Sequence, residues 1–248
     1  MDSKIDTAMV LAAGLGTRMR PASQEKPKPL VALAGKPLID HVLDRLAAAG
    51  IARAIVNVHH KADQIEAHLA GRQTPRVIIA NEREKLLDTG GGIKKALGLL
   101  GDDGFIAHNS DSVWLERSVA NSGGSNLARL IAAWNAEQMD CLLMLALGSA
   151  AVGYDGRGDF ALESDGRIRR RRENDVVPFV YTGVQILHPR AFAATPDGPF
   201  SCNLVWNHAM LTGRAYGLRM DGLWMHVGAP DALAEAERVM ATGRIGHE

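Results

Sequence analysis

The sequence has few cysteines and no long apolar run. Its 248 residues include two cysteines, Cys141 and Cys202, without CxxC spacing. This argues against a disulfide framework and against a thiolate metal site. Both cysteines stand beside apolar residues, so we expect them to be buried. The longest apolar stretch, Cys141–Leu147, is far too short to cross a bilayer.

The sequence also lacks an excess of charge of either sign. Lys plus Arg is 28 and Asp plus Glu is 28, which gives a net charge of zero. A general nucleic-acid binder is usually basic, so we expect no nucleic-acid partner. A small anionic substrate remains possible, because a few local donors can hold a phosphate. The first residues, MDSKIDTAMV, are charged and show no signal-peptide pattern, which predicts a soluble cytoplasmic protein without a membrane partner.

Short apolar segments alternate with amphipathic ones up to about residue 147. Strands are predicted at 7–13, 54–58, 77–80, 105–109 and 140–147, and helices at 37–49, 61–70, 92–100 and 126–138. Such alternation is typical of an α/β fold: a Rossmann-like, mostly parallel mixed sheet flanked by helices. The length suits one large domain.

Beyond residue 147 the pattern becomes richer in strands. A hairpin is predicted around the Asp165-Gly166 turn, and further strands at 176–187, 215–220 and 223–227. Helices are predicted at 202–211 and 230–240. We expect a small β-rich region that acts as a lid or binds an acceptor, built onto the sheet.

The stretch LAAGLGTRMRPASQEKPKPL after the first strand is the most informative part of the sequence. Gly14 and Gly16 permit tight turns and let backbone amides approach a phosphate. Arg18 adds a fork of donors, and prolines stiffen the segment that carries Lys26 and Lys28. A phosphate-binding loop is therefore predicted. It is not a P-loop, which needs Gly-Lys-Ser or Gly-Lys-Thr, and it lacks the third glycine of a dinucleotide-binding loop.

The segments LAAGLGTRMRP and PKPLVALAGKPLIDHVL resemble the signature of the sugar-1-phosphate nucleotidyltransferases. Further matches are LLDTGGGIKKAL, NSDSVW, GRGDF, YTGVQILHP and WMHVGAPDALAEAE, so the resemblance covers nearly the whole chain. It implies condensation of a nucleoside triphosphate with a sugar 1-phosphate, with release of pyrophosphate. The triple-glycine block and GRGDF favour UTP and N-acetylmuramate 1-phosphate, a reaction of bacterial peptidoglycan recycling.

The resemblance also implies roles for particular residues. Arg18 and Lys28 would be catalytic, orienting the triphosphate and stabilising the charge that develops on it. The implied nucleotide-binding residues are Leu11, Ala12, Ala13, Gly14, Gly16, Thr17, Arg18, Lys28, Thr89, Gly90 and Gly91. The implied sugar-side residues are Asn109, Gly158, Asp159, Tyr181, Thr182, Gly183 and Asn203. The chain would then be a single domain, with a nucleotide-binding part at 1–147 and a sugar-binding part and C-terminal helix at 148–248.

A metal site is expected at Asp111. This residue follows a predicted strand, and sites in open α/β sheets lie beyond the carboxyl ends of strands. A carboxylate there suits Mg²⁺, which shares oxygen ligands with phosphates, and Mn²⁺ is an alternative. The family usually has a second metal-binding aspartate near the C-terminus, where this chain has His226. His226 is interpreted as a phosphate contact, with metal ligation or loss of activity as alternatives.

The acceptor region also departs from the family pattern. Many relatives place a glutamate and a lysine near the sugar phosphate, whereas here four consecutive arginines, 169–172, precede Glu173. Such a run usually forms a solvated face, and at most two of the four can point into one cleft because strand residues alternate. His59 and His60 are interpreted as loop residues.

Two other functions are compatible with the pattern. One is the same chemistry on mannose or heptose 1-phosphate with GTP or CTP. The other is a non-catalytic nucleotide-sugar sensor, which His226 suggests and which the retained Arg18, Lys28 and Asp111 argue against. The chain is expected to be a monomer or a small homo-oligomer.

Overall fold

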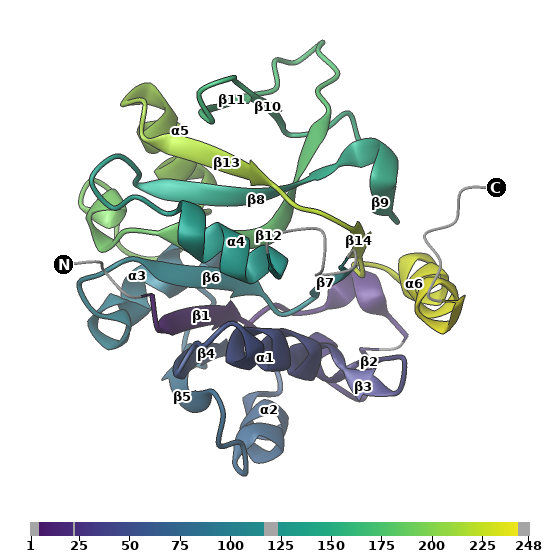
Figure 1. Cartoon of the computed structure of the whole chain (residues 1–248). Helices are drawn as coiled ribbons and strands as arrows, with labels where there is room; N and C mark the ends of the chain where they lie inside the picture. Colours follow the sequence, from purple (N-terminus) through teal and green to yellow (C-terminus); the bar gives the residue numbers. More distant parts are fainter. Residues whose placement is uncertain (1–4, 22, 117–123, 243–248) are drawn as a thin grey trace.

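The computed structural model describes residues 5–21, 23–116 and 124–242. Residues 1–4, on which part of the signal-peptide argument rests, lie outside this range. In the described part, nine strands form one sheet in the order β11-β10-β12-β6-β1-β4-β5, with β8 beside β12 and β13 beside β8 (Figure 1). Their bounds are β1 Thr7–Leu11, β4 Arg53–Val58, β5 Arg76–Asn81, β6 Phe105–Asn109, β8 Cys141–Leu147, β10 Phe160–Leu162, β11 Ile168–Arg170, β12 Phe179–Leu187 and β13 Ala215–Arg219.

The predicted α/β fold is confirmed. Strands β4, β1 and β6 pair in parallel, as do β5 with β4 and β13 with β8. Strand β12 is inserted between β6 and β8 and runs antiparallel to both. The antiparallel hairpin β10–β11 joins β12 through the Phe160–Phe179 pair. Strand β12 of segment 148–248 thus lies between β6 and β8 of segment 1–147, so the two segments interleave in one sheet.

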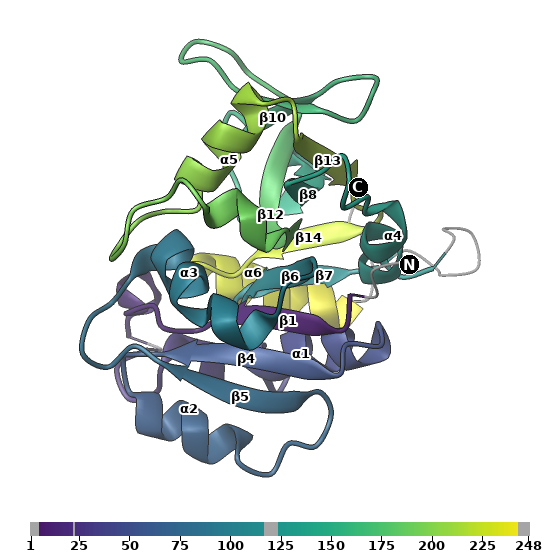
Figure 2. The same ribbon diagram turned by 90° about the vertical axis from the view of Figure 1, so that its left-hand side faces the viewer.

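Helices cover both faces of this sheet. Helices α1 and α4 lie on one side and α3 and α5 on the other (Figures 1 and 2), and α2 packs into the same core as α1. Alternate strand residues separate the cores: Ala8 and Val10 face α1, while Met9 faces α3. The bounds are α1 Leu38–Ala48, α2 Ala62–Leu69, α3 Asp88–Leu100, α4 Asn126–Ala133 and α5 Asn203–Leu211.

A third core holds the smaller elements against the main sheet. Strand β14 pairs with β7 and β9, and β2 pairs with β3. Helix α6 packs there with residues of the first loop, including Met19 and Val31. The bounds are β2 Ala32–Leu33, β3 Lys36–Pro37, β7 Ser112–Leu115, β9 Ala151–Val152, β14 Leu223–His226 and α6 Pro230–Thr242. Strands β2, β3, β7 and β9, of two to four residues each, were not predicted.

Two predicted helix boundaries are wrong. Helix α3 begins at Asp88 rather than at 92, because the Phe200 carbonyl accepts the backbone N–H groups of Gly90 and Gly91 at 2.9 and 3.0 Å. Helix α4 ends at Ala133 rather than at 138. Asn135 follows it and accepts the backbone N–H of Glu137 on its own side chain, which competes with helix continuation.

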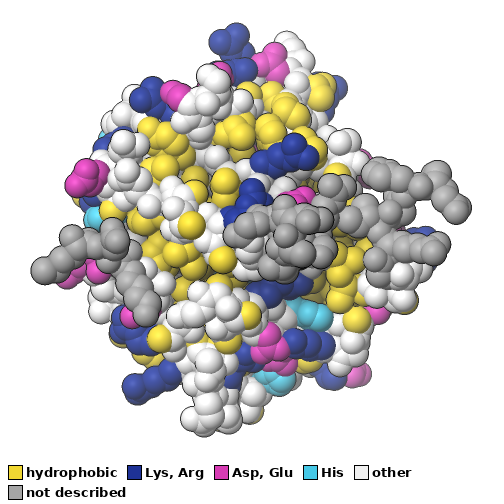
Figure 3. Space-filling model, in the orientation of Figure 1, with side chains coloured by type: hydrophobic (Ala, Val, Ile, Leu, Met, Phe, Trp, Pro, Cys, Tyr) yellow, Lys and Arg dark blue, Asp and Glu magenta, His cyan; other side chains and the backbone are white. Residues whose placement is uncertain are grey.

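The two cysteines are free and buried, as expected. Burial raises the pKa of both thiols, to about 12 for Cys202. Charged side chains of both signs are interspersed with hydrophobic ones on the face seen in Figure 3. No helix within the described ranges is long and apolar enough to cross a membrane.

Asp140, just before β8, ties three segments of the second half together. Its side chain is 10% exposed, and one carboxylate oxygen accepts Nε of Arg190 at 2.6 Å and of Arg214 at 2.9 Å. Burial acts to raise the pKa of Asp140, but the hydrogen bonds from Arg214 and Arg190 outweigh it and the pKa is lowered. The carboxylate therefore contributes stability above about pH 4, which is lost as the pH falls through the lower folded pKa.

We predict that Asp140→Asn lowers the free energy of unfolding by about 2 kcal/mol at pH 7, because two arginines lose their charged partner. Urea unfolding at pH 7 and at pH 3 measures the effect, and the difference from the unsubstituted protein should shrink at the lower pH. Asp102→Asn, at an exposed loop position, is the control. An equal destabilisation at both pH values would contradict the charge-based explanation.

Candidate functional site

A cavity of about 670 Å³ lies at the carboxyl ends of β1, β4 and β6. This is the edge of a parallel sheet at which ligands usually bind. Segment 11–19 of the first loop, Lys28, Thr89 and Asp111 contribute to its wall. The remaining lining residues are Pro29, Asn57, Glu82, Leu86, Asp88, Asn109, Ser110, Pro199 and Gly228.

The first loop is shaped by short-range packing. Gly16 adopts φ +64°, and a Cβ there would stand 3.1 Å from Cβ of Lys28. The Gly16 carbonyl accepts the hydroxyl of buried Ser23 at 2.7 Å. Buried Met19 anchors the end of the turn in the third core. A Cβ at Gly14 would meet open space, and Gly14 lines the cavity.

Lys28 forms an ion pair with Asp111, 83 residues further along the chain. Lys28 opens a short 3-10 turn between Pro27 and Pro29, and its side chain is 13% exposed. Asp111 lies in the turn between β6 and β7 and is 24% exposed. The structure thus brings the predicted catalytic lysine and the predicted metal-binding carboxylate together. Lys26 is exposed and does not line the cavity.

His226 reaches this pair through strand pairing. It stands opposite Ser112 in the antiparallel β7–β14 ladder, one residue from Asp111. Burial lowers the pKa of His226; the charges of Lys28 and Arg18 add to this effect, while those of Asp111 and Asp159 oppose it. The imidazole is therefore neutral at pH 7. Arg18 itself is exposed.

Asn57 and Glu82 form a buried polar network in the wall of the cavity. The sequence did not predict this network. The Asn57 side chain accepts the Ala12 backbone N–H at 2.7 Å and donates to Glu82 at 2.7 Å. Glu82 is 1% exposed and also accepts the Leu87 backbone N–H at 3.3 Å. The sequence feature that could have predicted the network is Asn57, a polar residue in the otherwise apolar predicted strand 54–58. This network connects the first loop to the start of α3.

The triple-glycine block packs tightly at the start of α3. A Cβ on Gly90 would stand 2.4 Å from Phe200, one on Gly91 2.2 Å from the Gly198 carbonyl, and one on Gly92 2.7 Å from Glu82. Thr89 lines the cavity, whereas Gly90 and Gly91 are not among the lining residues. The packing explains the glycines without a ligand, and their role in nucleotide binding stays a prediction.

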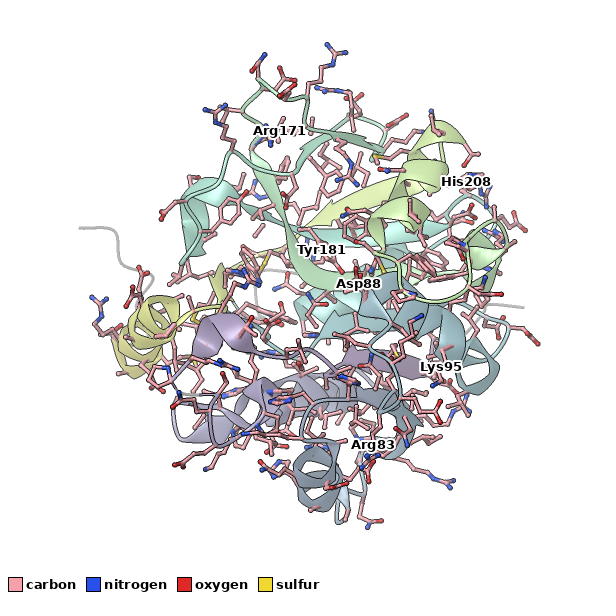
Figure 4. The ribbon with its side chains drawn as sticks, turned by 180° about the vertical axis from the view of Figure 1, so that it is seen from behind. Arg83, Asp88, Lys95, Arg171, Tyr181 and His208 are labelled. Carbon is pink, nitrogen blue, oxygen red and sulfur yellow. The ribbon has the colours of Figure 1, made fainter. Side chains whose placement is uncertain are left out.

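Asp88 is a second feature that sequence reasoning missed. It lines the cavity with φ +60°, a conformation that non-glycine residues rarely adopt. Figure 4 shows it at the start of α3, with Tyr181 of β12 in the same central region of that view.

Of the predicted sugar-side residues, only Asn109 lines the cavity; Tyr181, Thr182 and Gly183 lie on β12, Gly158 and Asp159 just before β10, and Asn203 at the start of α5. A bulge interrupts the β8–β12 pairing between Tyr181 and Gln185. Gly183, at φ +84°, lies against Asn109, and a Cβ there would stand 2.9 Å from its amide nitrogen. The Thr182 carbonyl accepts the hydroxyl of Ser112. The bulge is thus held against the turn that carries Asp111.

The GRGDF segment adjoins the same bulge. Asp159 accepts the Tyr181 backbone N–H at 2.9 Å. Gly158, at φ +78°, passes so close to Val177 that a Cβ would stand 2.0 Å from its carbonyl oxygen. Asn203 begins α5, and the neighbouring Cys202 backbone N–H donates to the Thr89 hydroxyl at 3.0 Å. The sugar-side residues therefore border the cavity through Thr89 and Asn109.

Within the described residues, no group of three or more His, Cys, Asp or Glu side chains is arranged to hold a metal ion. Of the two predicted metal-binding residues, Asp111 lines the cavity and His226 does not. One carboxylate beside a cavity fits a Mg²⁺ ion that takes most of its ligands from substrate phosphates and water.

Comparison with known proteins agrees with this geometry. Residues 8–154 match the family described as the MobA-like NTP transferase domain. The N-acetylmuramate alpha-1-phosphate uridylyltransferase of Caulobacter vibrioides is 48% identical, over 94% of this chain and 96% of that protein. The enzyme of the same name from Neisseria meningitidis serogroup B is 34% identical, over 93% of this chain and 96% of that protein.

Solved structures share the fold. HddC from Yersinia pseudotuberculosis, complexed with GMP-PN, has a TM-score of 0.75 at 23% identity and covers 95% of this chain and 100% of its own. UTP-bound UGPase from Acinetobacter baumannii has a TM-score of 0.75 at 21% identity, over 97% of this chain and 95% of its own. Together with the two relatives, these findings show that the chain is a member of the MobA-like NTP transferase family and belongs to the sugar-1-phosphate nucleotidyltransferases.

Proposed function

We propose that this protein transfers the uridylyl group of UTP to N-acetylmuramate 1-phosphate, as a cytoplasmic enzyme of peptidoglycan recycling. The observation that carries the proposal is the Lys28–Asp111 ion pair inside a cavity walled by a glycine-rich loop. The relative at 48% identity, which carries the name of this activity, supports the choice of substrates.

The proposed reaction needs positioning and charge compensation rather than a covalent nucleophile. An oxygen of the sugar 1-phosphate attacks the α-phosphorus of UTP and forms a new P–O bond. The bond between the α-phosphorus and the bridging oxygen breaks, and the electron pair leaves with pyrophosphate. Two anions must approach each other, so cationic groups around the triphosphate lower the barrier.

The residues of the cavity supply that compensation. Lys28 would leave Asp111 and contact the phosphates, where it offsets the charge that develops on the transferred group. Arg18, on the exposed side of the loop, would orient the triphosphate and the departing pyrophosphate. Backbone amides of segment 14–18 would line the phosphate chain.

A divalent cation is part of the proposal. Asp111 would hold Mg²⁺, or Mn²⁺, and the cation would polarise the phosphates and offset their negative charge. His226, neutral and half-buried beside Asp111, would donate a hydrogen bond to a phosphate oxygen. We further propose a monomer or small homo-oligomer that acts without nucleic acid.

Pyrophosphate release tests the whole proposal. The protein is incubated with each of ATP, CTP, GTP and UTP and with the 1-phosphates of N-acetylmuramate, N-acetylglucosamine, mannose and heptose, with Mg²⁺ or Mn²⁺. We expect the highest rate with UTP and N-acetylmuramate 1-phosphate. A higher rate with GTP or CTP and another sugar would favour the related enzymes, and binding of nucleotide without any release would favour a sensor.

We predict that Lys28→Met lowers kcat/KM by roughly 10²- to 10³-fold, because a cation directed at the developing charge is lost. Lys26→Met is the matched control from the same proline-rich segment, and its activity should stay close to that of the unsubstituted protein. Steady-state pyrophosphate release measures both variants. Equal losses in the two would show that Lys28 has no special role.

We predict different outcomes for substitutions of Asp111, the partner of Lys28, and of His226. Asp111→Ala should lower kcat by roughly 10³-fold or more, to below detection, because the metal loses its protein carboxylate. His226→Ala should lower kcat by roughly 10- to 100-fold, the effect of one hydrogen bond to a charged group. Turnover measured across a Mg²⁺ titration compares them, and similar residual activity in both variants would refute this ranking.

A further inference from the structure

Among the four consecutive arginines 169–172, Arg170 is the one whose guanidinium lies over aromatic rings and donates to side-chain amides. Arg169 lies near two acids, 3.6 Å from Glu163 and 3.8 Å from Asp175. Arg171 donates to backbone carbonyls, including that of Gly158 at 3.1 Å. No Asp or Glu oxygen among the described residues lies within 4.0 Å of the Arg170 guanidinium.

The Arg170 guanidinium is nevertheless held in a fixed orientation. Its Nε donates to the Asn207 side chain at 3.2 Å, and its Nη2 donates to the Asn203 side chain at 3.1 Å. Its central carbon lies 5.2 Å from the Phe160 ring and 6.0 Å from the Trp206 ring. The amide oxygens fix the plane of the group but do not neutralise its charge. Nη1 and one hydrogen of Nη2 have no acceptor among the residues that the structure describes.

Because the Arg170 side chain is half-buried, its positive charge is less well hydrated than that of an exposed arginine. Burial lowers the pKa of Arg170, and the charge of Asp159 opposes that effect. A positive charge above aromatic rings, with neutral amides as its nearest acceptors, gains from an anion more than a fully solvated arginine does. The guanidinium is thus arranged to bind a planar anion rather than to form an ion pair within the protein.

Arg170 also lies beside the proposed acceptor region. Asn203, which orients it, follows Cys202, whose backbone N–H donates to Thr89 in the cavity wall. Trp206, beneath it, packs edge-on against Tyr181 with ring centroids 4.7 Å apart. The Tyr181 backbone in turn donates to Asp159. The β10–β11 hairpin and α5, which carry these groups, lie next to each other in Figure 2.

N-acetylmuramate differs from N-acetylglucosamine by a lactyl ether that carries a carboxylate. We propose that Arg170 binds this carboxylate and selects an acidic acceptor sugar, an inference that rests on the proposed function. The two free N–H groups at the end of the guanidinium form the fork that a carboxylate accepts in bidentate fashion. Asn203 and Asn207 are positioning residues, since they act by orienting Arg170.

The test uses two acceptors of the same shape: N-acetylmuramate 1-phosphate and its analogue in which the lactyl carboxylate is an uncharged amide. Arg170→Met keeps an apolar stem over Phe160 and removes the charge. We expect it to lower kcat/KM for the carboxylate acceptor by roughly 10- to 100-fold. The value for the amide acceptor and the KM for UTP should change little. Arg170→Lys should recover part of the loss, because it restores the charge without the fork.

Arg169→Met is the matched control, because Arg169 is the adjacent strand residue and its nearest charged partners are acids of the protein. It should not discriminate between the two acceptors. Binding of UDP-N-acetylmuramate and UDP-N-acetylglucosamine, measured by calorimetry, gives a readout without turnover, and Arg170→Met should weaken only the former. Thermal unfolding of each variant establishes that it is folded.

The outcomes separate the inference from the function on which it rests. If the unsubstituted protein uses both acceptors and Arg170→Met affects them equally, or affects neither, the role of Arg170 is wrong and the proposed reaction stands. If the unsubstituted protein releases pyrophosphate only with neutral sugar 1-phosphates, the proposed acceptor and the role of Arg170 are both wrong. No release with any sugar would overturn the proposed reaction itself.

Discussion

The ion pair between Lys28 and Asp111 closes one loop onto another across the carboxyl edge of the sheet. Lys28 comes from a turn with prolines on both sides, and Asp111 from the connection between β6 and β7. Neither partner is deeply buried, so the pair does not hold the fold together by itself. It does hold two groups of opposite charge, each suited to one part of a metal–triphosphate complex, at the edge of the same cavity.

The position of this pair depends on packing outside the cavity. The third core fixes the first loop through Met19 and Val31, and fixes β7 and β14 through Val113 and Met225. Beneath the loop, Asn57 and Glu82 connect β1 to the start of α3 through buried hydrogen bonds. Buried polar groups that are fully paired favour one arrangement of their neighbours. Contacts within the protein therefore shape the site before any ligand binds.

Strand β12 joins the two regions that are proposed to bind the substrates. It is inserted antiparallel between β6, which leads to Asp111, and β8, and its bulge lies against Asn109. Its first residue pairs with β10, the strand whose hairpin carries Arg170. One strand thus connects the residues proposed to bind the acceptor with the turn that carries Asp111. An acceptor and a triphosphate that bind on either side of the bulge would have their reacting groups close to Asp111 and His226.

Local sequence determined the regular elements and much of the cavity. The predicted 105–109 strand coincides with β6, and the predicted 37–49 helix differs from α1 by one residue at each end, because apolar periodicity is a local property. The glycines, Arg18 and Lys28 of the first loop line one cavity as predicted, while their chemical roles remain predictions. Tertiary structure alone decided where α3 begins, since Phe200 supplies its N-terminal acceptor. It also decided that His226 pairs with the residue next to Asp111, that Asn57 and Glu82 support the loop, and that Arg170 has no acidic partner within 4.0 Å among the residues that the structure describes. Each of these depends on residues distant in sequence, whose proximity is set by strand register and core packing rather than by any local pattern.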